Sequence, residues 1–207
     1  MSCFPEGLCF LPAVVVISSS ATFIISFIIA LLRHDVDVFL PYISDTANSP
    51  PESCFFGVMT FISSTASIFT IYAMYKCMSK VGEDTGLIST SCNKVALGLG
   101  LTSCFGMCVV ATFQESAVET VHLIGALLFL FVEICTSVFV ISVAFLIPTV
   151  ICKFLDQFYN SQERIFQKAS AGCEWIVAFS FIGYFYTYIP DFKQFTLKVT
   201  TVRQTGN

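Results

Sequence analysis

The chain has 207 residues, of which 56% are hydrophobic and only 12% are charged, and its mean hydropathy is +0.82. Soluble domains carry about a quarter charged residues, so this composition excludes an ordinary soluble domain. The net charge of −4 comes without a Lys/Arg cluster, so we expect no nucleic-acid partner. The composition indicates an integral membrane protein.

Five apolar runs follow one another along the chain. Continuous apolar runs of about 18 or more residues are typical of helices that span a membrane. The predicted spans are residues 8–32, 54–75, 95–113, 123–152 and 171–189. The predicted fold class is therefore an all-α, polytopic membrane helix bundle that forms a single domain over the whole chain.

Two of the runs carry small residues at every fourth position. These are Ser18, Thr22, Ser26 and Ala30 in the first run, and Gly98, Thr102 and Gly106 in the third. Small residues at this spacing share one helix face and let a second helix approach closely. We expect both stripes to be helix–helix contacts.

The run 123–152 sets the number of spans. Its 30 residues would form one helix of about 45 Å. The hydrocarbon core is about 30 Å thick, so one tilted helix fits, whereas two spans need about 17 residues each plus a turn. A single charge, Glu133, interrupts the run, and no turn signal lies in its middle. Length therefore favours one span here and five spans in total.

The basic residues are distributed unevenly among the loops. One occurs in 33–53 and none in 114–122, whereas 76–94 contains three. Cytosolic loops carry an excess of Lys and Arg, so we expect the start of the chain and loop 76–94 in the cytosol. With five spans the C-terminal tail would lie on the opposite, lumenal side. Its basic residues are Lys193, Lys198 and Arg203.

Ten cysteines and two histidines raise the question of a metal site or disulfides. Most of the cysteines lie inside apolar runs, no C-x-x-C pair occurs, and only two histidines are present to complete a zinc site. An intramembrane hydrolase would need several His, Asp or Ser groups at one depth, which the sequence does not provide. We expect no metal, no cofactor and no enzymatic activity.

Residues 39–53, FLPYISDTANSPPES, form the most polar and proline-rich segment, and it lies between two apolar runs. Asp45 and Tyr42 in this segment can build a turn, because Asp accepts hydrogen bonds from nearby backbone N–H groups and the prolines restrict the backbone. They can also form a surface that binds a lumenal partner. Both interpretations stay open from the sequence.

Several motifs occur in the same order as in a known family. They are Leu40-Pro41-Tyr42-Ile43-Ser44-Asp45-Thr46, Pro51-Glu52 with Phe56-Gly57, Cys104-Phe105-Gly106-Met107, Val121-His122, Cys173-Glu174-Trp175 and Asp191-Phe192. Together they resemble the damage-regulated autophagy modulator family, and within it the first paralogue type. The resemblance covers most of residues 1–126 and 171–198.

The resemblance implies a multi-pass lysosomal membrane protein that positively modulates autophagy and stress-linked cell death, without catalytic residues. It implies contacts with the lipid bilayer and with membrane or lumenal proteins of unknown identity. The family has six spans, whereas one run, 123–152, stands here where two are expected, and a Trp-Asn-Pro motif is absent. The chain therefore resembles a family member that lacks about one hairpin in its second half.

Two groups of candidate site residues follow. The candidate lumenal contact loop comprises Pro41, Tyr42, Ser44, Asp45, Thr46 and Glu52, and the candidate intramembrane polar residues are Glu174 and Glu133. A bare carboxylate in lipid costs a few kcal/mol, so such residues usually face the bundle or mark a functional path. The alternative function is accordingly a small transporter or lipid-handling protein. Glu174 beside Trp175 also fits a membrane interface without such a role.

Two further motifs lie in or near loops. Histidine side chains change charge between about pH 5 and 8, so His122 can be a sensor of an acidic compartment or an ordinary loop histidine. Tyr75-Lys76-Cys77-Met78 has the Tyr-x-x-bulky form of an endolysosomal sorting signal, a pattern that is also common by chance.

Overall fold

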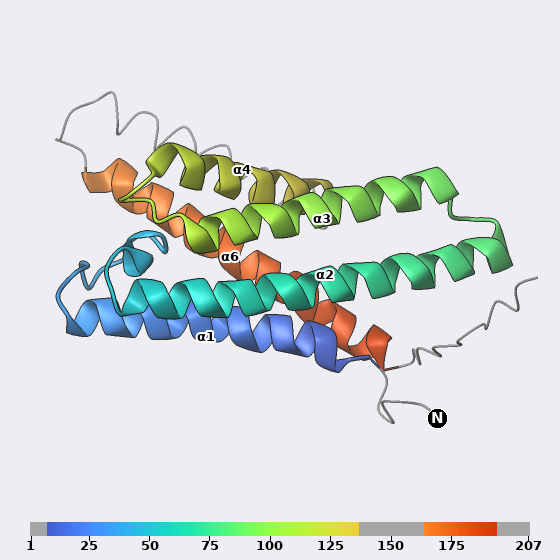
Figure 1. Cartoon of the computed structure of the whole chain (residues 1–207), viewed down its shortest axis with the longest axis horizontal. Coiled ribbons are helices and arrows are strands. Elements are labelled where there is room, and N and C mark those ends of the chain that lie inside the picture. The colour runs from blue at the N-terminus through green and yellow to red at the C-terminus, as the bar shows by residue number, and fades with distance from the viewer. Residues whose placement is uncertain (1–7, 137–163, 194–207) are drawn as a thin grey trace, which may run out of the picture.

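The computed structural model describes residues 8–136 and 164–193 of the chain. Their helices are α1 (Phe10–Leu32), η1 (Asp45–Ala47, a 3₁₀ helix), α2 (Glu52–Thr85), α3 (Thr90–Thr112), α4 (Glu119–Thr136) and α6 (Arg164–Phe192) (Figure 1). The helices α1, α2 and α3 are each long and apolar enough to cross a membrane, and no strand occurs in the described part of the chain. The predicted all-α membrane helix bundle is confirmed.

The α2 helix extends well beyond the predicted span 54–75. It has 34 residues, or about 51 Å, against a hydrocarbon core of about 30 Å. It ends at Gly86, which adopts the left-handed conformation that commonly terminates helices, with φ 69°. Hydropathy thus located the apolar part of this helix but not its polar end.

Successive helices from α1 to α4 run in alternating directions, and each packs against the next (Figure 1). The α6 helix packs against α1. It begins at the end of the bundle that holds the α1–α2 loop and finishes beside the start of α1. There the N–H of Leu8 donates to the carbonyl of Phe192 at 3.2 Å.

The start of α1 and the end of α6 therefore lie at the same end of the bundle. An odd number of crossings, such as the five expected, would place them on opposite faces of the membrane. The predicted position of Lys193 opposite the chain start is wrong, because Lys193 directly follows Phe192. The length of an apolar run carries no information on the direction in which the next helix runs. Lys198, Arg203 and the part of the run 123–152 beyond Thr136 lie outside the described residues.

The small-residue stripe predicted on α1 is confirmed as a packing face. All four of its members, Ser18, Thr22, Ser26 and Ala30, are at most 4% exposed. The hydroxyls of Ser18 and Ser63 lie 2.6 Å apart, which joins this face to α2 by a hydrogen bond.

The stripe predicted on α3 is only partly correct. Gly106 does lie at the α3–α4 contact, where an added Cβ would stand 2.6 Å from the carbonyl oxygen of Gly125. Gly98 has open space around it, and Thr102 is exposed. The packed positions of α3 are instead Gly100, which lies against Ile71 of α2, and Gly106, which lies against α4. The helix α3 contacts both neighbours, so its packed residues do not follow a single stripe.

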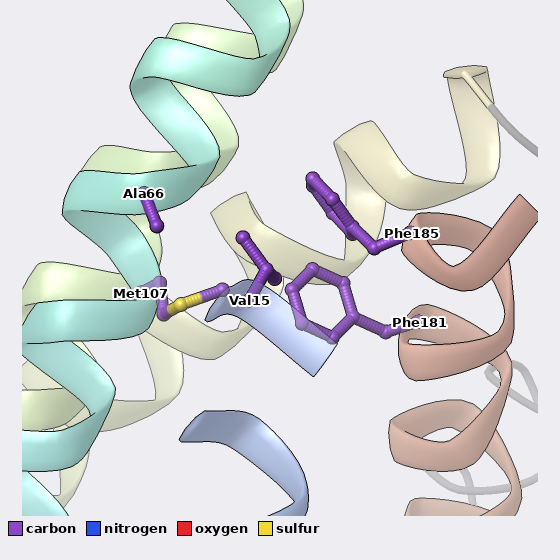
Figure 2. Packing of buried hydrophobic residues seen from close by; sticks show 5 residues of the cluster. All are labelled: Val15, Ala66, Met107, Phe181 and Phe185. Carbon is purple, nitrogen blue, oxygen red and sulfur yellow. The ribbon is translucent and has the colours of Figure 1, made fainter. Parts of the chain in front are cut away.

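The core lies where α1, α2, α3 and α6 meet. Val15, Ala66, Met107, Phe181 and Phe185 pack together there, one or two from each helix (Figure 2). The rings of Phe181 and Phe185 have centroids 4.9 Å apart. This cluster ties α6 to the three helices that precede it by more than 50 residues.

Several hydroxyl groups bond to the backbone of their own helix. Ser18 donates to the carbonyl of Val14 at 2.6 Å, Thr22 to that of Ser18 at 2.7 Å, and Thr70 to that of Ala66 at 2.8 Å. Each acceptor lies four residues earlier in the helix, so these donors are satisfied without a second helix.

Candidate functional site

The α1–α2 loop, residues 33–51, folds back along α6. The Lys168 Nζ lies 4.6 Å from the ring centroid of Phe39, and the Trp175 indole N–H donates to the carbonyl of Pro41 at 2.9 Å. A helix rises 1.5 Å per residue, so these two contacts carry the loop about 10 Å along the side of α6.

Two polar side chains of α6 satisfy backbone groups of the loop. The Ile43 N–H donates to Oε2 of Glu174 at 3.0 Å, and Trp175 donates to Pro41 as described. A backbone polar group without a partner costs several kcal/mol in a membrane, so these bonds allow the loop to lie against α6. The sequence located Glu174 and Trp175 near a span edge but did not show this role, since their partners are 131 and 134 residues away.

Aromatic rings hold the Trp175 side chain in place. The rings of Phe23 and Phe27 from α1 meet the indole edge to face, with centroids 6.5 and 6.1 Å away. The Phe179 ring lies 5.7 Å away on α6 itself. Such pairs contribute about 0.5–1.5 kcal/mol each beyond their buried area. The indole is therefore a fixed donor to the loop.

The loop also has an internal network around η1. The Thr46 hydroxyl donates to the carbonyl of Ile43 at 2.6 Å, and the Asn48 amide donates to Oδ1 of Asp45 at 3.2 Å. The backbone N–H of Ser116, in the α3–α4 loop, donates to Oδ1 of Asn48 at 3.3 Å. Asp45 thus takes part in building the turn, and the turn is joined to the neighbouring loop.

Burial divides the predicted contact residues into two groups. Four are at most 9% exposed, namely Tyr42, Ser44, Thr46 and Glu52. Pro41 and Asp45 are partly exposed. A partner that approaches this end of the bundle would therefore meet Pro41 and Asp45, and a contact role for the loop stays a prediction.

Glu52 lies fully buried at the first position of α2. Neither of its carboxylate oxygens has a hydrogen-bond partner among the described residues, but Nε of Arg33 lies 3.7 Å from Oε2. The same Nε lies 3.1 Å from Oδ2 of Asp35. The start of a helix also favours a negative charge. Arg33, at the beginning of the loop, therefore pairs electrostatically with the residue that follows the end of the loop.

A cavity of about 480 Å³ opens between the loop and the start of α6. Its lining includes three carboxylates, Asp35, Asp37 and Asp45, and one ammonium group, Lys168. Across the described ranges, no group of three or more His, Cys, Asp or Glu side chains is arranged to hold a metal ion. The cavity is therefore a polar recess at the end of the bundle with mixed charge.

The remaining predicted residues lie elsewhere. Glu133 belongs to α4, but its side chain lies outside the described residues. Nδ1 of His122 lies 2.6 Å from the carbonyl oxygen of Phe113, so the imidazole bridges the two ends of the α3–α4 loop. The segment Tyr75–Met78 is continuous α2 helix.

Comparison with known proteins identifies the family. The Frag1/DRAM/Sfk1/Cwh43P N-terminal domain matches residues 7–141 and 135–195 of the chain. The chain belongs to this family. It is 38% identical to DNA damage-regulated autophagy modulator protein 1 of Homo sapiens, with 97% of the chain and 98% of that protein covered.

More distant Frag1/DRAM relatives also match along most of the chain. Identity is 37% to DNA damage-regulated autophagy modulator protein 2 of Rattus norvegicus, with 95% of the chain and 88% of that protein covered. It is 24% to the modulator of macroautophagy TMEM150B of Danio rerio, with 86% and 82% covered. No solved structure matches the chain.

These comparisons support the predicted missing segment of this Frag1/DRAM protein. The alignment with the human relative runs over 235 positions although it covers only 97% of the 207 residues of the chain, so the relative contains residues that this chain lacks. The family model matches the chain in two segments, and both segments include residues 135–141. The same residues therefore align with family positions on either side of the missing segment. The omission therefore lies near the end of α4.

Proposed function

We propose that this protein is a lysosomal membrane protein that positively modulates autophagy and stress-linked cell death. It acts through protein or lipid contacts of the folded α1–α2 loop and does not catalyse a reaction. The observation that carries the proposal is that two family motifs distant in sequence, Leu40–Thr46 and Cys173–Trp175, bind each other in the fold. The names of the relatives, which describe modulators of autophagy, supply the process.

The polar groups of the loop support a binding role over a catalytic one. Glu174, Trp175 and Thr46 bond to loop backbone, and Asp45 bonds to Asn48. Groups used in this way build a defined surface and are not arranged around a reacting atom.

The alternative function, transport, would need a polar path through the helices. The sequence makes Glu174 a candidate for such a path, but its carboxylate accepts a hydrogen bond from the Ile43 N–H at the end of the bundle. The carboxylate therefore serves the loop, which favours a binding role over transport.

The proposal is tested by autophagic flux in cells depleted of their own autophagy modulators of this family. We expect the wild-type chain to restore flux and the double variant Asp45→Ala with Pro41→Ala to restore it poorly at equal abundance. The matched control is Lys80→Ala with Leu87→Ala, two exposed residues at the opposite end of the bundle. Equal flux in both double variants would remove the case for a specific loop surface.

The lysosomal location is tested separately by fractionation. We expect a tagged copy to co-fractionate with lysosomes, since the family motifs occur near both ends of the chain. Stable residence of the wild-type protein in the endoplasmic reticulum would contradict the location, whatever the flux assay shows.

A further inference from the structure

The α1–α2 loop carries exposed apolar side chains at its outer edge. Val38 is 78% exposed, Phe39 69% and Leu40 38%. Single exposed apolar residues are ordinary on protein surfaces, but these three are consecutive and lie next to a membrane-spanning helix. We propose that this loop tip, residues 38–40, inserts into the non-cytosolic leaflet of the bilayer as an interfacial anchor, an inference that does not depend on the role in autophagy.

The depth of the loop tip follows from its contacts with α6. Phe192, at the end of α6, bonds to Leu8 beside the start of α1. Since α1 has 23 residues, the residue of α6 level with Leu32 lies about 23 residues before Phe192, close to Lys168. The Lys168 ammonium group stands over the Phe39 ring at 4.6 Å. The loop tip is therefore level with the end of α1, where the hydrocarbon core meets the headgroups.

An exposed apolar face of α1 ends close in sequence to the loop tip. On α1, Ile24 is 52% exposed, Ile28 46% and Leu32 75%. Residues four apart lie on one helix face, so these side chains form an apolar strip that runs to the end of the helix. The loop tip follows six residues later at the same depth. Lipid is therefore the occupant that this surface fits, because the loop tip lies level with the end of a helix that is long and apolar enough to cross a membrane.

The backbone presents the tip outward. His34 and Leu40, on either side of the outer segment of the loop, are both non-glycine residues in the left-handed region, with φ 63° and 54°. Such residues persist only where their surroundings impose the conformation. At Leu40 the surrounding contact is close, since Cδ2 would be 3.3 Å from a Cβ added to Gly172. The packing of Leu40 on α6 thus leaves Val38 and Phe39 exposed.

The chemistry around the loop tip suits a headgroup region. Aromatic rings concentrate at membrane interfaces, and a lysine lays its apolar stem along lipid while its ammonium reaches the headgroups. Arg33 pairs with Asp35 at 3.1 Å, and Asp37 is exposed. Three carboxylates, Asp35, Asp37 and Asp45, line the same cavity as Phe39 and Lys168. This excess of negative charge does not attract the loop tip to a zwitterionic bilayer, so insertion depends on apolar burial and only weakly on salt.

Photocrosslinking in vesicles tests the anchor. The full chain, with p-benzoylphenylalanine at position 39, is reconstituted into phosphatidylcholine vesicles and irradiated, and phospholipid adducts are measured by mass spectrometry. The same group at position 24, in the middle of α1, is the positive control. The same group at position 87 is the negative control, because Leu87 is 86% exposed beyond the long α2 helix. All three sites are exposed, so the probe leaves the packing of the bundle intact.

We expect about tenfold more lipid adduct at position 39 than at position 87, because only the former lies at the depth of acyl chains. The yield at position 39 should match that at position 24 and should not change between low and high salt. A yield at position 39 no higher than at position 87 would overturn the proposal. A crosslink to a second copy of the chain, or a yield lost at high salt, would overturn it as well.

Discussion

Glu174 and Glu52 are two carboxylates at the same end of the bundle with opposite surroundings. Glu174 accepts a hydrogen bond from the Ile43 N–H, whereas Glu52 is fully buried and only approaches Arg33 at 3.7 Å. Glu174 is a hydrogen-bond acceptor for the backbone of the loop. Glu52 is a buried charge that a nearby cation has to compensate. The two residues therefore respond differently to the same substitution.

Replacement of Glu174 by Ala should loosen the loop. The Ile43 N–H would lose its acceptor, which costs about 1–3 kcal/mol when the group is buried. Glu174→Gln keeps an acceptor oxygen and should lose less. The measurements are unfolding in mixed detergent micelles and the rate of proteolysis within residues 33–51, with the exposed Glu119→Ala as control. Equal effects of Ala and Gln would show that the acceptor does not hold the loop.

Replacement of Arg33 by Ala should destabilise the protein through Glu52. Removal of the cation leaves a buried carboxylate uncompensated, and because Arg33 is half-exposed we expect about 1–2 kcal/mol, below the value for a fully buried pair. Glu52→Gln removes the charge and should recover most of that loss in the double variant. The four unfolding free energies form a double-mutant cycle. Additive effects would mean that the two side chains do not interact.

At this scale the sequence predicted the residues better than their partners. It indicated that Glu174 lies near a span edge with Trp175, because a carboxylate is excluded from the middle of lipid. It did not predict the bond to Ile43, which arises only when the loop folds back on a helix 131 residues later. The sequence did not predict the burial of Glu52 either, because the first turn of an isolated α2 helix would be exposed to its surroundings.

The difference between α1 and α3 shows what limits prediction at the scale of elements. On α1 all four small residues of the stripe are buried, and the four-residue spacing identified them. On α3 small residues occur on more than one face, and the positions of α2 and α4 select between them. Spacing alone cannot make that choice.

A pair of glycine substitutions on α3 tests the packing face. Gly106→Ala would place a Cβ 2.6 Å from the Gly125 carbonyl oxygen, so we expect a loss of about 1–3 kcal/mol from overpacking. Gly98→Ala meets nothing within 4 Å and should be neutral or stabilising by up to about 1 kcal/mol through helix propensity. Unfolding in mixed micelles measures both. A loss at Gly98 equal to that at Gly106 would contradict the observed face.

For the whole molecule, the hydropathy of the sequence predicted a helical membrane bundle but not the direction of its last helix. Apolar runs report where a chain can enter lipid, and they do so here for α1, α2 and α3. The direction of α6 is shown by the contacts that its first half makes with the loop and that Phe192 makes with Leu8. Such contacts join residues far apart in sequence and leave no periodic signal.

The shared end of α1 and α6 predicts the membrane topology. We expect epitope tags at the two ends of the chain to lie on the same side of the membrane, because Leu8 bonds to Phe192. Protease protection of both tags in sealed vesicles of the membrane that holds the protein, with and without permeabilisation, measures this. A tag inside the loop, after Asp37, should show the opposite protection and serves as the control. Tags on opposite faces would contradict the arrangement of α6.

The hydrogen bonds inside the helices also bear on how the protein is made. Ser18, Thr22 and Thr70 are satisfied within their own helices, so α1 and α2 can enter lipid one at a time during synthesis. The loop between them has no such independence, since Ile43 has to wait for Glu174 to be translated 131 residues later. Docking of the loop is therefore a late step of biogenesis. A nascent or truncated chain that lacks α6 would display an undocked loop, which distinguishes unfinished copies from completed ones.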